Sequence, residues 1–372
     1  MIYFDNAATT RKKPEEVYDA FNYYVREIGT SPGRGSYSLS IQASRMLYQS
    51  RKTVCDFFGA TNPSNVVFTK NSTEAINFFF NGFLKKGDHV IISPFEHNAV
   101  LRPLHSLKEK GIIDYTILPE TAFCSESIDL VDYLKENTKL LAITFASNLT
   151  GQFVFSSNLS KKAKENGLIV FVDASQGAGK KLINMARDNI DFLAFTGHKD
   201  LLALPGVGGF VGLSDFKFEP FVQGGTGIHG ESYTNPEAYP DSYEAGTLNM
   251  PAIWSLKNSI DYINLHLKDL CKKEKDLLYL FIEELSKIEK VVLYKQKAER
   301  VPTFCFNIEG KPSNEVVKYL SDNDICVRGG IHCAILAHET IGTVKTGAVR
   351  VSINAFNTKE EIYKFIDVIK EL

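Results

Sequence analysis

Short apolar runs alternate with segments of helical length and helical period over the first 200 residues of the chain. Such runs are typical of strands that are buried on both faces of a parallel sheet and are joined by helices. The pattern therefore predicts an α/β fold with a large, doubly wound and mainly parallel sheet. The predicted strands are residues 66–69, 90–93, 115–118, 140–144, 168–172 and a run that ends at Thr196.

Amphipathic helical patterns accompany these runs. Residues 14–28 form the first, with two glutamates in its first turn, and residues 39–58 form the second. A third helix starts at Ser72 or Thr73, directly after a strand, and continues to Phe80. Its position places free backbone amides at the carboxyl edge of the predicted sheet.

The pattern changes after residue 250. Residues 251–290 are periodic throughout, and one unbroken helix of that length is unusual, so we expect a break. Shorter elements follow and indicate a small α+β domain, with strands at 303–308, 325–328 and 349–353 and helices at 313–322 and 359–372. The predicted organisation is an N-terminal segment (1–15) that packs with the small domain, a large domain (16–250), a connecting helical segment (251–290) and a small C-terminal domain (291–372).

Composition excludes several classes of protein. A chain of 372 residues with 44% hydrophobic residues can bury the cores of two domains. The net charge of −2 gives no electrostatic basis for binding nucleic acid or an anionic membrane. No apolar stretch approaches the roughly 20 residues of a membrane span, and the N-terminus lacks the features of a signal peptide. We therefore expect a cytoplasmic protein that binds neither nucleic acid nor membranes.

Six cysteines in a chain of this length do not indicate a disulfide framework. Cys333 differs from the others, because it lies in the glycine-rich stretch 328–334, which has no periodicity. A cysteine on a loop is a better candidate nucleophile than one on a strand. The cysteines expected to fill the core, since they lie within apolar patterns, are Cys55, Cys271, Cys305 and Cys326.

Lys199 and Asp173 carry the most specific chemistry. Asp173 follows an apolar run, and Lys199 follows the Thr196 strand 26 positions later. Pyridoxal phosphate needs a lysine amine for its aldehyde and an acidic partner for its pyridine nitrogen. Thr196 and His198 can hold a phosphate beside the lysine, and Gln176 can reach the ring hydroxyl of the cofactor. The sequence therefore predicts a pyridoxal phosphate site.

With these residues in place, the chain resembles the class V aminotransferase-like enzymes of fold type I, which depend on pyridoxal phosphate. Within that group it is similar to the cysteine desulfurases and selenocysteine lyases. The resemblance runs from residues 3–10 (YFDNAATT) to residues 355–358 (AFNT), nearly the whole chain. It implies a large pyridoxal phosphate-binding domain and a smaller C-terminal domain that carries a catalytic cysteine loop.

The resemblance assigns further cofactor contacts. It implies that Ser72 and Thr73 hold the phosphate and that His97 stacks on the ring and also moves protons. It places Asn148 near the cofactor and the substrate. Without the resemblance, Ser72 and Thr73 belong to an ordinary helix N-terminus, His97 is a structural histidine and Asn148 belongs to a polar turn.

Thr247 lies in residues 243–247 (YEAGT), which match the family segment that reaches into the active site of a partner subunit. There the matching threonine contacts the phosphate. The resemblance therefore implies a homodimer with shared active sites.

Arg350 and Cys333 determine the expected reaction. The resemblance makes Arg350 the residue that binds the substrate α-carboxylate, a task suited to a planar donor of two hydrogen bonds. An arginine within an apolar strand can instead pair with a buried carboxylate. Cys333 precedes Arg350 by 17 residues, a spacing that resembles the type II-like subgroup with a short, ordered catalytic loop.

The implied reaction converts L-cysteine to L-alanine. Lys199 moves the substrate proton, and the thiolate of Cys333 attacks the substrate sulfur to form a persulfide, for which members of this subgroup usually need a sulfur-acceptor protein. L-Selenocysteine is an alternative substrate for the same residues. An aminotransferase or β-lyase, with Cys333 as a bystander, is a second alternative, and a noncatalytic cofactor-binding module is a third.

Two positions depart from the family pattern, and two motifs suggest a dinucleotide or metal site that the rest of the sequence does not support. The turn after Lys199 has its proline one position late, and Ile335 and Leu336 replace a proline that often follows the catalytic cysteine. Residues 225–230 (GTGIHG) fit a dinucleotide-binding pattern, but no helical period follows them, so we interpret them as a mobile glycine loop. His332, Cys333 and His338 lack a second ligand pair with suitable spacing, and we expect no metal site.

Overall fold

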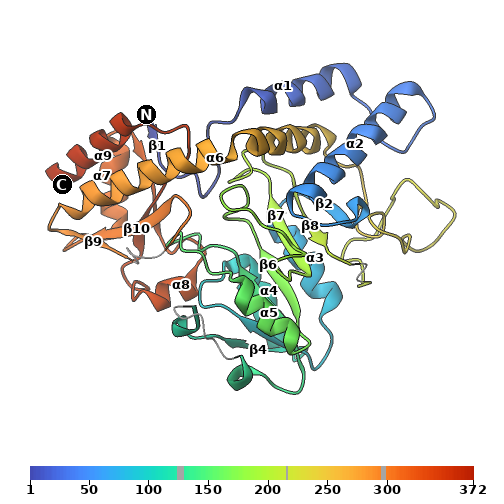
Figure 1. The fold of residues 1–372 in the computed structure, drawn as a ribbon, viewed down its shortest axis with the longest axis horizontal. Helices are drawn as coiled ribbons and strands as arrows, with labels where there is room; N and C mark the ends of the chain where they lie inside the picture. Colours follow the sequence, from blue (N-terminus) through green and yellow to red (C-terminus); the bar gives the residue numbers. More distant parts are fainter. Residues whose placement is uncertain (124–129, 215–216, 295–298) are drawn as a thin grey trace.

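A seven-stranded sheet forms the centre of the molecule, in a computed structural model that describes residues 1–123, 130–214, 217–294 and 299–372 (Figure 1). The strand order is β2-β8-β7-β6-β5-β3-β4. β8 is antiparallel to both neighbours, whereas all pairs from β7 to β4 are parallel. The predicted mainly parallel α/β fold is confirmed. The strands are β2 (Val66–Thr69), β3 (His89–Ile92), β4 (Asp114–Ile117), β5 (Thr138–Thr144), β6 (Ile169–Asp173), β7 (Phe192–Thr196) and β8 (Gly208–Gly212).

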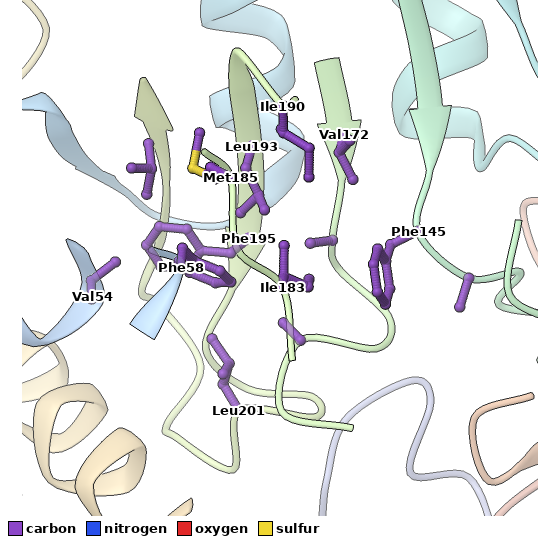
Figure 2. Packing of buried hydrophobic residues seen from close by; sticks show 14 of the residues in the cluster. Val54, Phe58, Phe145, Val172, Ile183, Met185, Ile190, Leu193, Phe195 and Leu201 are labelled. Atoms are coloured by element: carbon purple, nitrogen blue, oxygen red, sulfur yellow. The ribbon is translucent and has the colours of Figure 1, made fainter. Parts of the chain in front are cut away.

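Side chains of this sheet alternate between two hydrophobic clusters, one on each face. Leu141 of β5 belongs to the cluster around Phe58 and Phe195 that Figure 2 shows, whereas its neighbour Leu140 belongs to the opposite cluster. Because both faces are covered, the strands appear in the sequence as continuous apolar runs. The covering helices are α2 (Ser38–Phe57), α5 (Ser157–Glu165) and α6 (Met250–Ser286) on the first face and α3 (Ser72–Phe83) and α4 (Asn98–Glu109) on the second.

The sequence pattern does not predict β8, because three of its five residues are glycines. A Cβ atom on Gly209 would lie 2.2 Å from the carbonyl oxygen of Val67 in the neighbouring strand β2. The close approach of these strands requires glycine, and glycine removes the side chains on which strand prediction relies.

A second, four-stranded sheet has the order β12-β13-β10-β9 and packs on a separate hydrophobic cluster. The N-terminal strand β1 pairs with β11 of this part of the chain. The domain boundaries stated above remain predictions. The elements are β1 (Ile2–Tyr3), β9 (Val291–Leu293), β10 (Thr303–Ile308), β11 (Ile325–Cys326), β12 (Arg328–Gly330), β13 (Ala348–Ser352), α7 (Ser313–Asp322), α8 (Ile335–Thr340) and α9 (Lys359–Glu371).

Helix α1 (Glu15–Tyr23) continues into a π-helical turn, Tyr24–Ile28, where the first helix was predicted to end. It packs on α2 through that turn and on the long helix α6, above the large sheet (Figure 1). Short 3-10 helices lie at Pro63–Asn65, Glu120–Phe123 and Val131–Tyr133.

The segment in which we expected a break is one unbroken helix, α6, of 37 residues. The expectation was wrong because each half of the helix has its own hydrophobic partner. The first half packs through residues such as Ile260 on the cluster of the large sheet, and the second packs through Phe281 on the cluster of the small sheet. No glycine or proline follows Pro251 within the helix, so its backbone hydrogen bonds continue throughout.

Two smaller expectations have mixed outcomes. Residues 217–249 contain no helix or strand, so the glycine motif at 225–230 does not open a helix, as expected. Cys55 and Cys305 are buried in the core, but Cys271 and Cys326 are partly exposed, and for these two the expectation of core burial was wrong.

Within the described part of the chain, no helix has both the length and the apolar character needed to cross a membrane.

A buried ion pair between Arg51 and Glu244 fixes the segment that carries Thr247. Both guanidinium Nη atoms of Arg51, on α2, donate to the carboxylate of Glu244. The same carboxylate accepts from the backbone N–H of Phe68 at 2.7 Å, and Arg51 also donates to the carbonyl of Val66. The pair therefore ties α2 and β2 to residues 243–247.

We expect Glu244→Gln to lower the free energy of unfolding by about 3–5 kcal/mol, because it leaves the buried Arg51 charge without a counter-charge. Urea unfolding followed by circular dichroism measures this change. Asp56→Asn is the control, since it breaks an ion pair with Lys52 on the same helix in which both side chains are more than half exposed, and we expect little change. Equal effects of the two substitutions would contradict the role assigned to the buried pair.

Candidate active site

A polar pocket of about 180 Å³ lies at the carboxyl ends of β5, β6 and β7. In a parallel sheet the loops that follow adjacent strands meet at this edge, and ligands bind there. The structure brings nine of the predicted site residues together in it. The lining residues are Asn71, Ser72, Thr73, His97, Thr144, Ala146, Asn148, Asp173, Ser175, Gln176, Thr196, His198 and Lys199.

Lys199 lies in the turn after β7, and the turn is held by the N-terminal segment. The hydroxyl of Thr10 donates to the carbonyl of Lys199 at 2.7 Å, and the Thr10 N–H donates to the carbonyl of His198 at 3.0 Å. Burial lowers the pKa of the Lys199 amine, and the positive charge of Arg350 lowers it further, whereas Asp173 acts in the opposite direction. A lysine held in this way is a better nucleophile near neutral pH than one in water.

Asp173 is the last residue of β6 and is almost completely buried. Its Oδ1 accepts hydrogen bonds from the backbone N–H and the hydroxyl of Ser175, which point the carboxylate into the pocket. Burial raises the pKa of Asp173, and the charge of Lys199 partly offsets that effect. A cationic ring nitrogen placed against this carboxylate would favour its ionised form.

The first turn of α3 and the end of β7 fit a phosphate. The Asn71 side chain caps the helix by accepting from the Glu74 N–H at 2.9 Å, which leaves the earlier N–H groups of the turn available for an anion. The hydroxyl of Thr196 is buried and has no hydrogen-bond partner among the residues that the structure describes. A buried polar atom without a partner is rare, so this hydroxyl points to a ligand.

His97 caps α4, and its ring is neutral. Nδ1 accepts from the Ala99 N–H at 3.0 Å, so a neutral ring carries its proton on Nε2. Burial lowers the pKa of His97 to about 3, and the charges of Lys199 and Arg350 act in the same direction. An uncharged imidazole of this kind can stack on an aromatic ring or donate one hydrogen bond from Nε2.

Arg350, on β13, lies outside the lining of the pocket but touches one of its residues. Its Nη1 donates to the carbonyl of Asn148 at 3.1 Å, and its Nη2 donates to Oδ1 of Asp5 at 2.5 Å. The alternative from the sequence, a pairing with a carboxylate, is therefore present, but the carboxylate is partly exposed and not buried. The Nε atom of Arg350 and the side-chain oxygen of Asn148 are buried without hydrogen-bond partners in the described residues. Both groups can still bind a ligand.

Cys333 lies on a loop between β12 and α8, as the sequence predicts. His332 and Cys333 both have φ near +55°, a left-handed conformation that costs energy for residues other than glycine. Two hydrogen bonds hold the loop. Asn148 donates to the carbonyl of His332 at 2.8 Å, and the Asn98 N–H donates to the carbonyl of Cys333 at 2.8 Å.

A second hollow, of about 570 Å³, has Cys333 in its lining and shares residues with the pocket. Thr73 and His97 line both spaces, and Cys333 lines the second one. Both ring nitrogens of His332 contact other groups, the carbonyl of Arg328 at 3.0 Å and the ring of His338 at 3.4 Å. His332 therefore does not activate the thiol through a hydrogen bond in this arrangement.

Thr247 is the predicted site residue that lies apart from the others. Its side chain is exposed, and it lines a different hollow, of about 460 Å³, together with Phe68 and Glu244. The structure does not bring Thr247 to Lys199 of the same chain. Among the described residues, no cluster of three or more potential metal ligands is found.

Glu96 is a buried residue that sequence reasoning missed. Its Oε1 accepts from the Ser93 hydroxyl and from the Thr144 N–H at 2.8 Å, while Oε2 is buried without a partner in the described chain. Burial raises the pKa of Glu96 to about 8, so the carboxyl is mostly protonated at neutral pH. The sequence signal was weak, because a glutamate beside a candidate histidine after a strand usually faces water.

Comparisons with known proteins agree with the geometry. A family model described as Aminotransferase class-V matches residues 2–365. The chain is 32% identical to a probable cysteine desulfurase of Methanothermobacter thermautotrophicus, over 100% of this chain and 94% of the relative. It is 30% identical to a cysteine desulfurase of Yersinia pseudotuberculosis, over 98% and 92% of the two chains. The apo structure of a cysteine desulfurase from Thermococcus onnurineus NA1 superposes with a TM-score of 0.90 at 32% identity, covering 100% and 94% of the chains.

The raised pKa of Glu96 predicts a pH effect on stability. Between about pH 4.5 and 8 the folded protein retains a proton that the unfolded chain releases, so the free energy of unfolding falls as pH rises through this range. The slope from one group is at most about 1.4 kcal/mol per pH unit. We expect Glu96→Gln to become more stable relative to the wild type as pH rises from 5 to 8.

Unfolding midpoints in urea at several pH values measure this difference. The exposed Glu136→Gln serves as the control and should keep the wild-type pH dependence. Parallel pH profiles for Glu96→Gln and the wild type would show that Glu96 is not protonated in the folded protein.

Proposed function

The chain belongs to the class-V aminotransferase family, and from this premise we propose that it is a pyridoxal phosphate-dependent cysteine desulfurase. It converts L-cysteine to L-alanine and takes up the sulfur on Cys333 as a persulfide. The observation that carries the proposal is a pair of hollows that share two lining residues. A partly buried lysine whose pKa is lowered lines one, a loop cysteine lines the other, and His97 and Thr73 border both.

The pocket residues suit pyridoxal phosphate, on which enzymes of this family depend. The cofactor supplies an electron sink that weakens bonds to the substrate α-carbon. Lys199 would bind its aldehyde, Asp173 would pair with its pyridine nitrogen and His97 would stack on its ring. The hydrogen-bonding groups proposed to hold the phosphate and the other polar atoms of the cofactor are those of Ser72, Thr73, Asn148, Gln176, Thr196 and His198.

Residues in and around the pocket bind the substrate and transfer its proton. Arg350 binds the α-carboxylate through its free Nε–H, and the unpartnered oxygen of Asn148 lies available beside it. Once the substrate occupies the pocket, the Lys199 amine is free to accept the α-proton, because burial has already lowered its pKa.

Cys333 completes the reaction. Its thiolate attacks the substrate sulfur, a sulfur–sulfur bond forms, and the carbon–sulfur bond of the substrate breaks with its electron pair remaining on carbon. Protonation of that carbon gives alanine. The persulfide is then available to an acceptor, which we propose is a separate protein.

We propose that the active form is a homodimer. Thr247 is exposed and lines a different hollow from Lys199 of its own chain, which supports a role for it in the site of a second copy. The Arg51–Glu244 pair holds the segment beside it in place. A cytoplasmic location stays part of the proposal, on the basis of the free thiols expected from the sequence.

The main test is the stoichiometry of products from L-cysteine. The pyridoxal phosphate-loaded protein should release alanine and, with a reductant, sulfide in equal amounts. Cys333→Ala should lose both products by at least about a hundredfold while retaining the visible absorbance of the cofactor. Cys326→Ala, at a partly exposed cysteine of the nearby strand β11, is the matched control and should remain active.

Undiminished product formation by Cys333→Ala would contradict a persulfide on this residue. Pyruvate in place of alanine would favour a β-lyase. Activity with L-selenocysteine alone would favour a selenocysteine lyase.

A second test concerns the lysine. Borohydride reduction of the loaded protein should add the mass of the cofactor to the wild type and to Lys13→Ala, but not to Lys199→Ala. Lys13 is a suitable comparison, because burial lowers its pKa to about 8 and makes it a rival amine near His198. Mass spectrometry of peptides from the reduced protein identifies the site, and labelling at Lys13 would show that the cofactor lysine is misassigned.

A further inference from the structure

The contact between Arg350 and Asp5 joins the two ends of the chain beside the pocket of the candidate active site. The guanidinium is 1% exposed, whereas the side chain of Asp5 is 20% exposed. A buried cation without a counter-charge is strongly destabilising, so the site needs a carboxylate beside Arg350. Asp5 provides that carboxylate.

The hydrogen bonds of Arg350 show what a substrate carboxylate meets. Nη1 donates to the carbonyl of Asn148, Nη2 donates to Asp5, and Nε is left without a partner in the described part of the chain. A carboxylate that binds arginine with two hydrogen bonds needs two adjacent N–H groups. Nε offers one of these N–H groups. The second is on Nη1 or Nη2, and each of these nitrogens already donates one hydrogen bond.

Of the two side chains, that of Asp5 is the one that can move away from the contact. Its backbone is held, since the carbonyl of Asp5 accepts from the Ala8 N–H at 3.1 Å and from the hydroxyl of Tyr3. Apart from Arg350, its side chain has no hydrogen-bond partner within the described ranges, and it reaches water. Arg350 is enclosed on β13 between β12 and β10 and cannot follow it.

We propose that Asp5 is a positioning residue that occupies Arg350 in the free site and competes with the α-carboxylate of the substrate. The inference rests on the proposed function, in which Arg350 binds that carboxylate. Asp5 keeps the guanidinium charge balanced between turnovers, and a ligand carboxylate has either to replace this contact or to lie beside a second negative charge. The cost of that exchange weakens the binding of every carboxylate ligand, including the product alanine, and so favours product release.

The experiment compares two ligands that differ only in the carboxylate, L-alanine and ethylamine. Their dissociation constants for the loaded protein are measured from changes in cofactor absorbance, with the KM for L-cysteine measured in parallel. Asp5→Asn should bind L-alanine about tenfold more tightly than the wild type, as expected for removing one competing charge at a partly exposed site. The KM for L-cysteine should fall with it, and ethylamine binding should not change.

Asp19→Asn, at an exposed position on α1, removes the same charge elsewhere and should leave both constants unchanged. If Asp5→Asn does not fold, Asp5→Ser makes the same comparison with a small polar residue. Unchanged or weaker binding of L-alanine in the Asp5 variant would overturn the proposal, and weaker binding would show that Asp5 only holds Arg350 in place.

Failure of the proposed function gives different results. Equal binding of L-alanine and ethylamine to the wild type would remove the carboxylate role of Arg350 itself. A wild type that prefers L-alanine but makes no alanine from L-cysteine would contradict the desulfurase reaction and leave the test of Asp5 intact.

Discussion

The burial of two cationic side chains close to one another is the constraint on which the site depends. Lys199 and Arg350 each lose most of their hydration, and each lowers the pKa of the neighbouring His97. Two carboxylates offset these charges, Asp173 at the end of β6 and Asp5 near the N-terminus. Lys199 follows β7, Arg350 lies within β13, and Asp5 pairs with Ser352 through an isolated bridge, so the strands hold these charges in place.

The N-terminal segment joins the parts of the site that the two sheets supply. Thr10 binds the carbonyls of the Lys199 turn, and Ala7 accepts a hydrogen bond from Gln176 at 2.8 Å. On the other side, Asn6 donates to the carbonyl of Ser352 at 2.9 Å, two residues after Arg350. A segment of six residues, 5–10, thus sets the distance between the lysine and the arginine. Hydrogen bonds of Asn6, Ala7 and Thr10 explain much of its sequence pattern, and Asp5 adds the counter-charge of Arg350.

The sequence predicts those features whose cause is local. Apolar runs marked the buried strands, and the residues after them were expected at one sheet edge, where Asp173 and Lys199 are found. The unbroken α6 was missed because its continuity depends on two separate hydrophobic clusters. The partner of Arg350 was left open for a similar reason, since Asp5 lies 345 residues away and no local signal connects the two.

The geometry of the catalytic loop limits how sulfur can leave. His332 and Cys333 hold strained left-handed conformations, and the loop persists because Asn98 and Asn148 bind their carbonyls. Both asparagines belong to the loops and helices that form the pocket, so the thiol is fixed relative to the cofactor site. Under the proposed reaction, Cys333 cannot carry its persulfide far from the pocket without breaking these contacts. If a separate protein accepts the sulfur, the hollow that Cys333, His97 and Thr73 line is the place where it would meet the persulfide, because the contacts that align the thiol for attack also hold it there.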